Sequence, residues 1–324
     1  MNLPQFVQIE PVGQCNLKCS MCPVVFREEK PPAFMSFDAF CRLLDGFGAV
    51  RELHLQGLGE PLLHPRFFDM VRYAAGRGIE VSTNTNLTAL SERRAEECVK
   101  SGLARLHVSL DAADAAVYEG IRRGTRFGKV LRNLGWLMEA KARLESRLPE
   151  IHIVAVAMRR NLEQLPALVR LAHAQGVGHV SVQQLAHDFT DEALPLRYEP
   201  MRAFVDEETL LGDDPERVQR WFSEARAVAE TLGVELRLPS LRGNGKTGRR
   251  CDWPWRGAYV AYSGEAMPCC MVATPDRVNF GSMIKEGVAP VWNGDAYREF
   301  RERLASDDDP PQICKGCAVY QGRF

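Results

Sequence analysis

The sequence lacks the features that would place the protein in a membrane or on nucleic acid. No apolar run reaches about 18 residues, the length that predicts a membrane-spanning helix. The 41 lysine and arginine residues nearly balance the 42 aspartate and glutamate residues, so no charge excess favours nucleic acid or an anionic lipid surface. Residues 1–5 show neither the basic nor the apolar region of a signal peptide. We therefore expect a cytoplasmic protein with no nucleic-acid or membrane partner.

A nucleotide-binding loop is also missing. Residues 243–248 match the glycine spacing of a dinucleotide-binding loop by letter, but no helical pattern follows them. Ser240 stands where a phosphate-binding P-loop requires its first glycine. We interpret residues 241–250 as a basic, mobile loop.

Cysteine, by contrast, is abundant, with ten residues in a chain of 324. Eight gather towards the two ends of the chain: Cys15, Cys19, Cys22, Cys251, Cys269, Cys270, Cys314 and Cys317. In a reducing compartment, clustered cysteines favour metal ligation over disulfides. Cys41 and Cys98 stand alone on predicted helices, where we expect them to pack as small hydrophobic residues.

Apolar runs that alternate with helical patterns predict an α/β fold. The predicted strands are 6–10, 52–56, 79–84, 103–110, 151–158 and 177–183. Strands separated by helices form right-handed βαβ units and a parallel sheet, and six units are too few for a complete eight-stranded barrel. We predict a partial (βα)6 TIM-like barrel over residues 1–187, a helical linker over 188–250 and a small cysteine-rich module over 251–324.

One face of the predicted strands is polar. The polar positions include His54 and Gln56, Ser82 and Asn84, His107 and Ser109, and His179, Ser181 and Gln183. Parallel strands in α/β folds usually have two apolar faces. The pattern therefore favours a cavity lined by polar side chains, with water-facing edge strands as the alternative.

Cys15, Cys19 and Cys22 follow the first predicted strand with spacings typical of a metal-binding loop. Thiolates hold iron–sulfur clusters, and three of them leave one iron of a four-iron cube without a protein ligand. A zinc site is the alternative, but structural zinc usually takes four ligands, and this loop offers three.

This CxxxCxxC loop after the first strand of a partial barrel resembles the signature of the radical S-adenosylmethionine (SAM) superfamily. Gly57–Pro61 is similar to the family's "GEP" segment, Thr83–Asn86 to its "TNG" segment with Asn86 in place of glycine, and Ser109–Asp111 to its fourth-strand end. The resemblance implies that SAM is bound by Met21 near adenine, Gly59 and Glu60 at the amino group, Asn84 on the ribose side, Ser109, Asp111, and Arg122 at the carboxylate.

The resemblance also implies the chemistry. A reduced 4Fe-4S cluster held by Cys15, Cys19 and Cys22 would cleave SAM to a 5′-deoxyadenosyl radical, which abstracts a substrate hydrogen atom. An external one-electron reductant, such as flavodoxin or ferredoxin, would be required.

The late cysteines Cys251, Cys269, Cys314 and Cys317 resemble the C-terminal SPASM/twitch extension of radical SAM enzymes. Their spacing is most similar to that of the dehydrogenase of 2-deoxy-scyllo-inosamine. They would hold a second, auxiliary 4Fe-4S cluster with no open site, suited to electron transfer. Cys270 is an alternative to Cys269, and a zinc ribbon or a redox CxxC pair at Cys314 and Cys317 remains open.

These features predict a dehydrogenase-like enzyme. An alcohol-bearing small molecule is the expected substrate, since peptide-modifying enzymes often carry an N-terminal peptide-recognition domain and only about five residues precede the first strand here. Oxidation must also release a proton, and the candidate catalytic residues are His54, Gln183 and Arg159, with Gln56 and His107 beside them. Peptide modification is one alternative, and a non-catalytic zinc-binding scaffold is another.

Overall fold

The computed structural model describes residues 2–26, 33–185, 195–240, 251–272, 274–306, 309–317 and 319–322. The predicted loop at 241–250 lies outside these ranges, as does part of the predicted linker. Among the described residues, no helix has the length and apolar character to cross a membrane.

One sheet runs through the described part of the chain, and its nine strands follow the order β7-β6-β5-β4-β3-β2-β1-β8-β9. Neighbouring strands are parallel except for β8 and β9. The strands are β1 (Phe6–Ile9), β2 (Glu52–His54), β3 (Glu80–Thr85), β4 (Arg105–Ser109), β5 (Glu150–Ala157), β6 (His179–Gln184), β7 (Glu235–Arg237), β8 (Gly257–Val260) and β9 (Ala266–Met267). The six predicted strands are β1 to β6, in chain order, so the partial barrel is confirmed.

The sheet does not stop at the sixth strand. In the predicted linker, β7 pairs with β6, and in the cysteine-rich module β8 pairs in parallel with β1, with Ile9 opposite Val260. The C-terminal module is thus joined to the barrel by backbone hydrogen bonds. Strand β8 was not predicted because four consecutive buried residues show no alternation.

Helices cover the outer face of the sheet. In the barrel they are α1 (Phe37–Phe47), α2 (Phe67–Ala75), α3 (Glu92–Val99), α4 (Ala115–Ile121), α5 (Phe127–Arg143) and α6 (Leu165–Ala174). Further along are α7 (Glu199–Glu208), α8 (Pro215–Leu232), α9 (Trp253–Arg256), α10 (Val288–Trp292), α11 (Asp295–Ala305) and α12 (Gln312–Lys315). Ser36 and Ser91 begin α1 and α3 by accepting hydrogen bonds from backbone N–H groups, as N-cap serines do.

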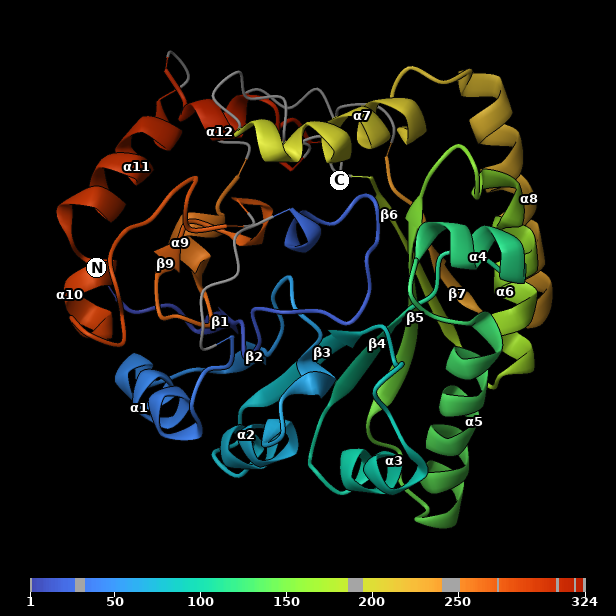
Figure 1. Ribbon diagram of the computed structural model, residues 1–324, viewed down its shortest axis with the longest axis horizontal. Coiled ribbons are helices and arrows are strands. Elements are labelled where there is room, and N and C mark those ends of the chain that lie inside the picture. Colours follow the sequence, from blue (N-terminus) through green and yellow to red (C-terminus); the bar gives the residue numbers. More distant parts are fainter. Residues whose placement is uncertain are drawn as a thin grey trace.

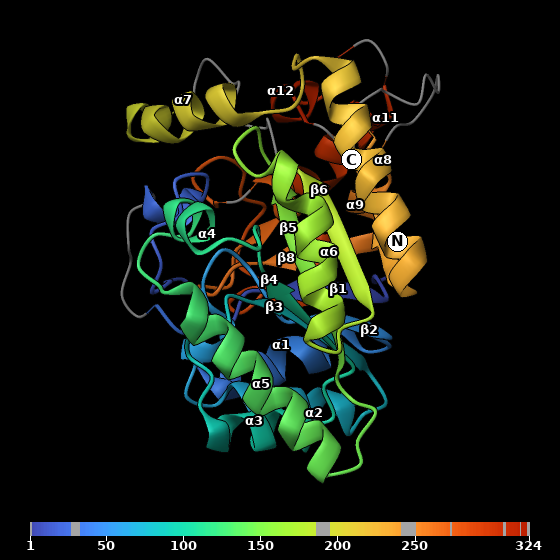
Figure 2. The same cartoon turned by 90° about the vertical axis from the view of Figure 1, so that its right-hand side faces the viewer.

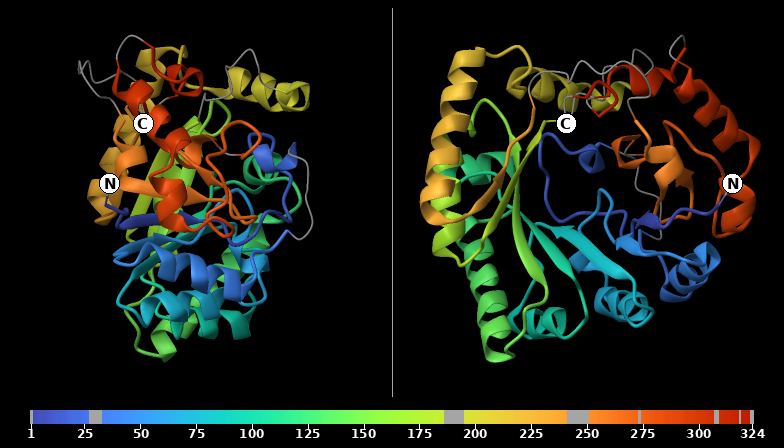
Figure 3. Two further views of the ribbon diagram at one scale, coloured as in Figure 1. Left: turned by 90° about the vertical axis from the view of Figure 1, so that its left-hand side faces the viewer. Right: turned by 180° about the vertical axis from the view of Figure 1, so that it is seen from behind.

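The sheet curves around a central space, with α1 to α6 outside it (Figure 1). Helices α6 and α8 lie side by side beyond β6 (Figure 2). The C-terminal module lies at the β1 edge (Figure 3). The main apolar core lies between sheet and helices, while the alternate positions of β3, β4 and β6 are only partly buried. The polar inner face is therefore real and lines the concave side.

Candidate active site

Cys15, Cys19 and Cys22 lie together in the loop after β1. The Cys22 N–H donates to the Cys19 carbonyl at 3.1 Å, and the Cys15 sulfur accepts from the Leu17 N–H at 3.4 Å. Burial, with a smaller contribution from neighbouring cysteines, raises the pKa of Cys15 to about 11 and that of Cys22 to about 12. Three close, free thiols, of which Cys19 is buried and the other two are partly buried, become thiolates when a cation replaces their protons. This donor set fits an iron–sulfur cluster.

Gly59 allows the loop after β2 to pack directly on the cysteine loop. A Cβ atom on Gly59 would lie 2.0 Å from the Val12 carbonyl oxygen and 2.8 Å from that of Gln14. The next residue, Glu60, donates its N–H to the Gln14 carbonyl at 2.9 Å. Only glycine permits this backbone approach, which places the GEP segment against the cluster loop.

The buried Glu60 carboxylate ties the GEP segment to the end of β3. It accepts hydrogen bonds from the Leu62 N–H at 3.0 Å, the Thr85 hydroxyl at 2.6 Å and the Asn86 N–H at 2.8 Å. Burial raises the pKa of Glu60, and these hydrogen bonds oppose that effect. A carboxylate has about four lone-pair positions, so one remains after these three donors. Its role at the SAM amino group stays a prediction.

Arg122 and Asp111 form a buried ion pair beside the cysteine loop. The Arg122 Nε lies 2.6 Å from Asp111 Oδ2, and the Val156 N–H donates to the other carboxylate oxygen at 2.8 Å. Burial alone would lower the pKa of Arg122, but Asp111, Cys19 and Tyr118 outweigh it and raise that pKa. Asp111 therefore fixes a cation near the three thiols, as a site for an anionic group requires.

Of the remaining predicted SAM-binding residues, Met21 belongs to the cysteine loop, while Asn84 and Ser109 lie near the C-terminal ends of β3 and β4. Asn84 accepts a hydrogen bond from His107 Nδ1 at 2.9 Å, and Ser109 ends β4. Met21 packs on an apolar cluster that contains Met158 and Tyr198. The fold thus brings residues from five separate segments to one end of the barrel. Their contacts with SAM stay predictions.

A cavity of about 480 Å³ occupies the concave side of the sheet. It is lined by His54, Asn84, Arg105, His107, Glu150, His152, Val154, His179, Val180, Ser181, Gln183, Glu235 and Arg237. His54 and Gln183, two of the predicted catalytic residues, are in this lining. Burial lowers the pKa of His54 to about 4, and burial with the neighbouring His54 and His152 does the same for His107. Both rings are neutral at pH 7.

Arg159 does not line the cavity. Its Nε lies 3.3 Å from Asp213, its Nη1 donates to the Glu207 carbonyl at 3.0 Å, and 43% of the side chain is exposed. Because Arg159 directly follows β5, its position in the sequence predicted a side chain that points into the barrel. In the structure, the turn after β5 directs the side chain towards Asp213 and Glu207 instead.

Glu10 is a positioning residue that the sequence reasoning missed. This fully buried residue follows β1, and one carboxylate oxygen accepts from the N–H groups of Leu58 at 2.9 Å and Gly59 at 3.4 Å. The other oxygen accepts from the Tyr262 N–H at 3.4 Å. Glu10 therefore joins the barrel, the GEP segment and the C-terminal module. An acidic residue directly after a buried strand and before the cysteine loop was the available signal.

The second cysteine group also comes together. Burial raises the pKa of Cys269 well above its ordinary value, and the nearby Cys270, Cys317 and Cys251 raise it further. The Cys317 N–H donates to the Cys314 carbonyl at 3.1 Å. All ten cysteines are free thiols. This group, in which Cys317 is buried and the other thiols are partly buried, fits a second iron–sulfur cluster.

Two family models match the chain. The radical SAM superfamily model matches residues 9–172, and that of an iron–sulfur cluster-binding domain, SPASM, matches residues 251–318. These ranges contain the two cysteine groups described above.

Several relatives span nearly the whole chain. The chain is 26% identical to the tungsten-containing aldehyde ferredoxin oxidoreductase cofactor-modifying protein of Pyrococcus furiosus, covering 92% of this chain and 83% of the relative. It is 24% identical to the AdoMet-dependent heme synthase of Methanosarcina barkeri, covering 98% and 88%. It is also 24% identical to the PqqA peptide cyclase of Xanthomonas euvesicatoria pv. vesicatoria, covering 97% and 80%.

Among solved structures, Streptococcus suis SuiB bound to S-adenosylmethionine aligns with a TM-score of 0.72 at 16% identity, covering 99% of this chain and 72% of SuiB. At this identity the alignment shows a shared fold. The two family models and the two thiol groups identify the cofactors as SAM and two 4Fe-4S clusters. The chain belongs to the radical SAM superfamily.

Proposed function

We propose that the protein oxidises a polar, hydroxyl-bearing small molecule held in the barrel cavity. The carrying observation is that this polar cavity extends as far as Asn84, close to the end of β3 that contacts the cysteine loop. Asn86 donates to the Cys15 sulfur, and Asn84, two residues earlier in the chain, lines the cavity. A substrate in the cavity would thus lie within reach of SAM bound at the cysteine loop. When bound, the reduced cluster and SAM supply the 5′-deoxyadenosyl radical that takes a hydrogen atom.

The cavity side chains would orient the substrate and accept its proton. His54 Nε2 donates to Gln56 Oε1 at 3.2 Å, so its Nδ1, 2.8 Å from the Ser82 hydroxyl, is an acceptor. His107 Nδ1 donates to the amide oxygen of Asn84, so the Nε2 of this neutral ring is unprotonated. His107 Nε2 is therefore an acceptor to which the substrate hydroxyl would donate a hydrogen bond, although the pKa of about 4 makes the ring a weak base.

The proposed reaction is a two-electron oxidation of an alcohol to a carbonyl, in which all atoms and electrons are accounted for. Carbon loses a hydrogen atom to the radical, and the hydroxyl then loses a proton to a cavity base and one electron, leaving a carbonyl. Cys251, Cys269, Cys314 and Cys317 would hold the auxiliary cluster, which supplies an acceptor for that electron. Flavodoxin or ferredoxin is the proposed donor for the first cluster.

The test is a substrate screen with anaerobically reconstituted enzyme, SAM and a reductant. Polyols, sugars and aminocyclitols are supplied singly, and 5′-deoxyadenosine and products are measured by mass spectrometry. We expect one substrate to stimulate 5′-deoxyadenosine formation, to lose two mass units and, when deuterated at the reacting carbon, to transfer deuterium to it. His107→Gln should slow the oxidation, while His173→Gln, a change on the exposed side of α6, should not. Iron-loaded enzyme that never cleaves SAM would overturn the proposal.

A peptide substrate is the second candidate, and the similarity to the PqqA peptide cyclase supports it. Short peptides encoded near this gene belong in the same screen. A peptide that drives 5′-deoxyadenosine formation and changes mass, with every alcohol inert, would replace the first proposal by this one.

Cys269, rather than Cys270, is the proposed auxiliary ligand, because its thiol has Cys251 and Cys317 among its neighbours. Fully loaded enzyme should contain about eight irons per chain, four in each cube. We expect Cys269→Ser to lose about half of this iron, and Cys270→Ser to keep it. The opposite result would assign the ligand to Cys270.

A further inference from the structure

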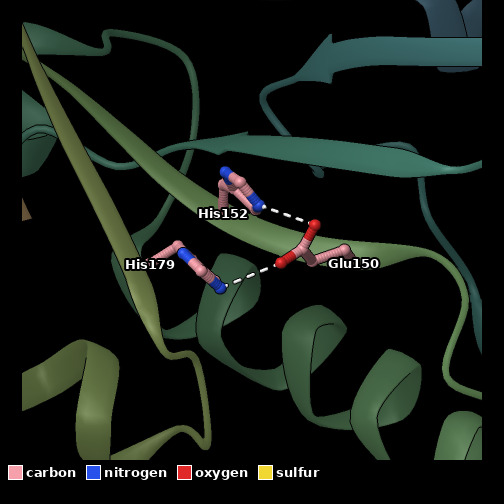
Figure 4. A group of neighbouring side chains, drawn as sticks. All are labelled: Glu150, His152 and His179. Atoms are coloured by element: carbon pink, nitrogen blue, oxygen red, sulfur yellow. Dashed lines mark ion pairs between the residues drawn. The ribbon is translucent and has the colours of Figure 1, made fainter. Parts of the chain in front are cut away.

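Three potential metal ligands meet at the end of the sheet where β5 and β6 begin. Glu150 is the first residue of β5, His179 is the first residue of β6, and His152 lies directly opposite His179 in the parallel register. Figure 4 shows the two imidazoles and the carboxylate turned towards one another. The cysteine loop follows the opposite, C-terminal end of β1, so this cluster is separate from the proposed SAM site.

The distances in the cluster suit a single cation. The Glu150 carboxylate lies 2.9 Å from His179 Nε2 through one oxygen and 3.3 Å from His152 Nε2 through the other. Ligand atoms of all three residues lie within 4.8 Å of one another. The two rings are stacked, with centroids 4.5 Å apart and planes 13° apart, so both Nε2 atoms approach the carboxylate from the same side.

His152 is the observation that points to a missing ligand. Its Nε2 atom is buried and makes no hydrogen bond of acceptable geometry, although Glu150 is 3.3 Å away. A buried polar atom without a partner is costly, and a bound cation would remove that cost.

A second carboxylate supports the other imidazole. Glu235, the first residue of β7, lies 3.2 Å from His179 Nδ1 through its Oε2 atom. A proton on Nδ1 leaves the Nε2 lone pair directed at Glu150. Metal-binding histidines usually donate their other ring N–H to a carboxylate or carbonyl in this way.

We propose that Glu150, His152 and His179 bind one zinc-like divalent cation, with Glu235 as the residue that orients His179. Two imidazoles and a carboxylate are a donor set of zinc sites, and three protein ligands leave one position for water. The cation would link β5 to β6 at the base of the cavity. The proposal does not depend on the substrate or on SAM cleavage.

The test measures zinc and iron separately in the holoenzyme. Enzyme carrying its full iron complement is dialysed anaerobically against micromolar Zn²⁺ and analysed by mass spectrometry of the metals. We expect one zinc per chain in the wild type and its loss in the double variant His152→Ala, His179→Ala. His173→Ala, which removes an exposed imidazole from α6, should keep the zinc.

Two further measurements guard against a variant that misfolds. Glu150→Gln keeps the shape of the cluster and should bind zinc more weakly, as should Glu235→Gln by about 10- to 100-fold. Zn²⁺ should raise the melting temperature of the wild type and leave that of the double variant unchanged. Equal zinc in the wild type and the double variant, or no zinc in the fully iron-loaded wild type, would overturn the proposal.

Discussion

The side-chain amide of Asn86 donates a hydrogen bond to the sulfur of Cys15, with 3.7 Å between Nδ2 and Sγ. The same residue donates its backbone N–H to Glu60, and its side-chain oxygen accepts from Thr88. Asn86 stands where the family's TNG segment has glycine, which has no side chain. The Asn86 side chain therefore gives a hydrogen-bond donor to the sulfur of Cys15, a predicted cluster ligand, and the contacts with Glu60 and Thr88 hold this donor in place.

This hydrogen bond should tune the cluster potential. Hydrogen bonds to cluster sulfurs influence the reduction potential, because they stabilise the added negative charge of the reduced state. Asn86→Ala should make the midpoint potential of the SAM-binding cluster more negative, as measured by redox titration with electron paramagnetic resonance. Asn84→Ala, two residues earlier with its amide oxygen bonded to His107, is the control and should leave the potential unchanged. Equal shifts in both variants would contradict the prediction.

Gly59→Ala should destabilise the protein and weaken SAM binding. The new methyl would meet the Val12 carbonyl at 2.0 Å, and backbone at this position cannot rotate aside. Overpacking of this kind costs about 1–3 kcal/mol. Gly135→Ala in α5 is the matched control, because nothing lies within 4 Å of its new methyl. Gly135→Ala should stabilise the helix by about 0.5–1 kcal/mol. The free energies of unfolding of both variants are measured by anaerobic urea denaturation.

Asp111→Asn should cost far more stability than loss of a surface ion pair. Asp111 is fully buried and Arg122 is 12% exposed, so the substitution leaves a buried guanidinium without its counter-charge. Breaking such a pair costs about 3–5 kcal/mol. The exposed Arg93–Glu97 pair supplies the control, and Glu97→Gln should cost under about 1 kcal/mol in the same denaturation experiment. Similar losses for both variants would show that the buried pair is not the stabilising feature.

The buried His54 should make folding stability depend on pH. Burial lowers its pKa from 6.5 to about 4, so the unfolded chain takes up a proton near pH 6.5 while the folded protein does not. The contribution of neutral His54 to the free energy of unfolding is therefore fully present above about pH 6.5. It is lost as the pH falls towards 4, by about 1.4 kcal/mol per pH unit.

His54→Gln should remove this dependence. The unfolding free energies of wild type and variant, measured at several pH values between about 7 and 5, should converge or cross as the pH falls. His173→Gln reports the effect of removing an imidazole from the surface. Parallel curves for the wild type and His54→Gln would refute the prediction.

Much of the fold and one half of the site were predictable because their signals are local. Cys15, Cys19 and Cys22 lie within eight residues, so their spacing alone indicates that they bind one metal centre together. The strands β1 to β6 were predicted from short apolar runs in which apolar and polar residues alternate. The polar inner face was predicted from the same period of two residues. The GEP segment was recognised by its resemblance to the family motif, and the structure adds that Gly59 must be glycine where two loops touch.

The remaining features depend on the register of distant strands and on side-chain directions at strand ends, and no local pattern encodes these. Parallel pairing of β8 with β1 places Tyr262 against Glu10, which are 252 positions apart. The register of β5 and β6 sets His152 opposite His179, and Arg159 turns outward just after β5. The sequence by itself therefore determined the cofactor chemistry and the barrel. Only the tertiary structure decided which distant side chains share the cavity and which carboxylate meets the paired imidazoles.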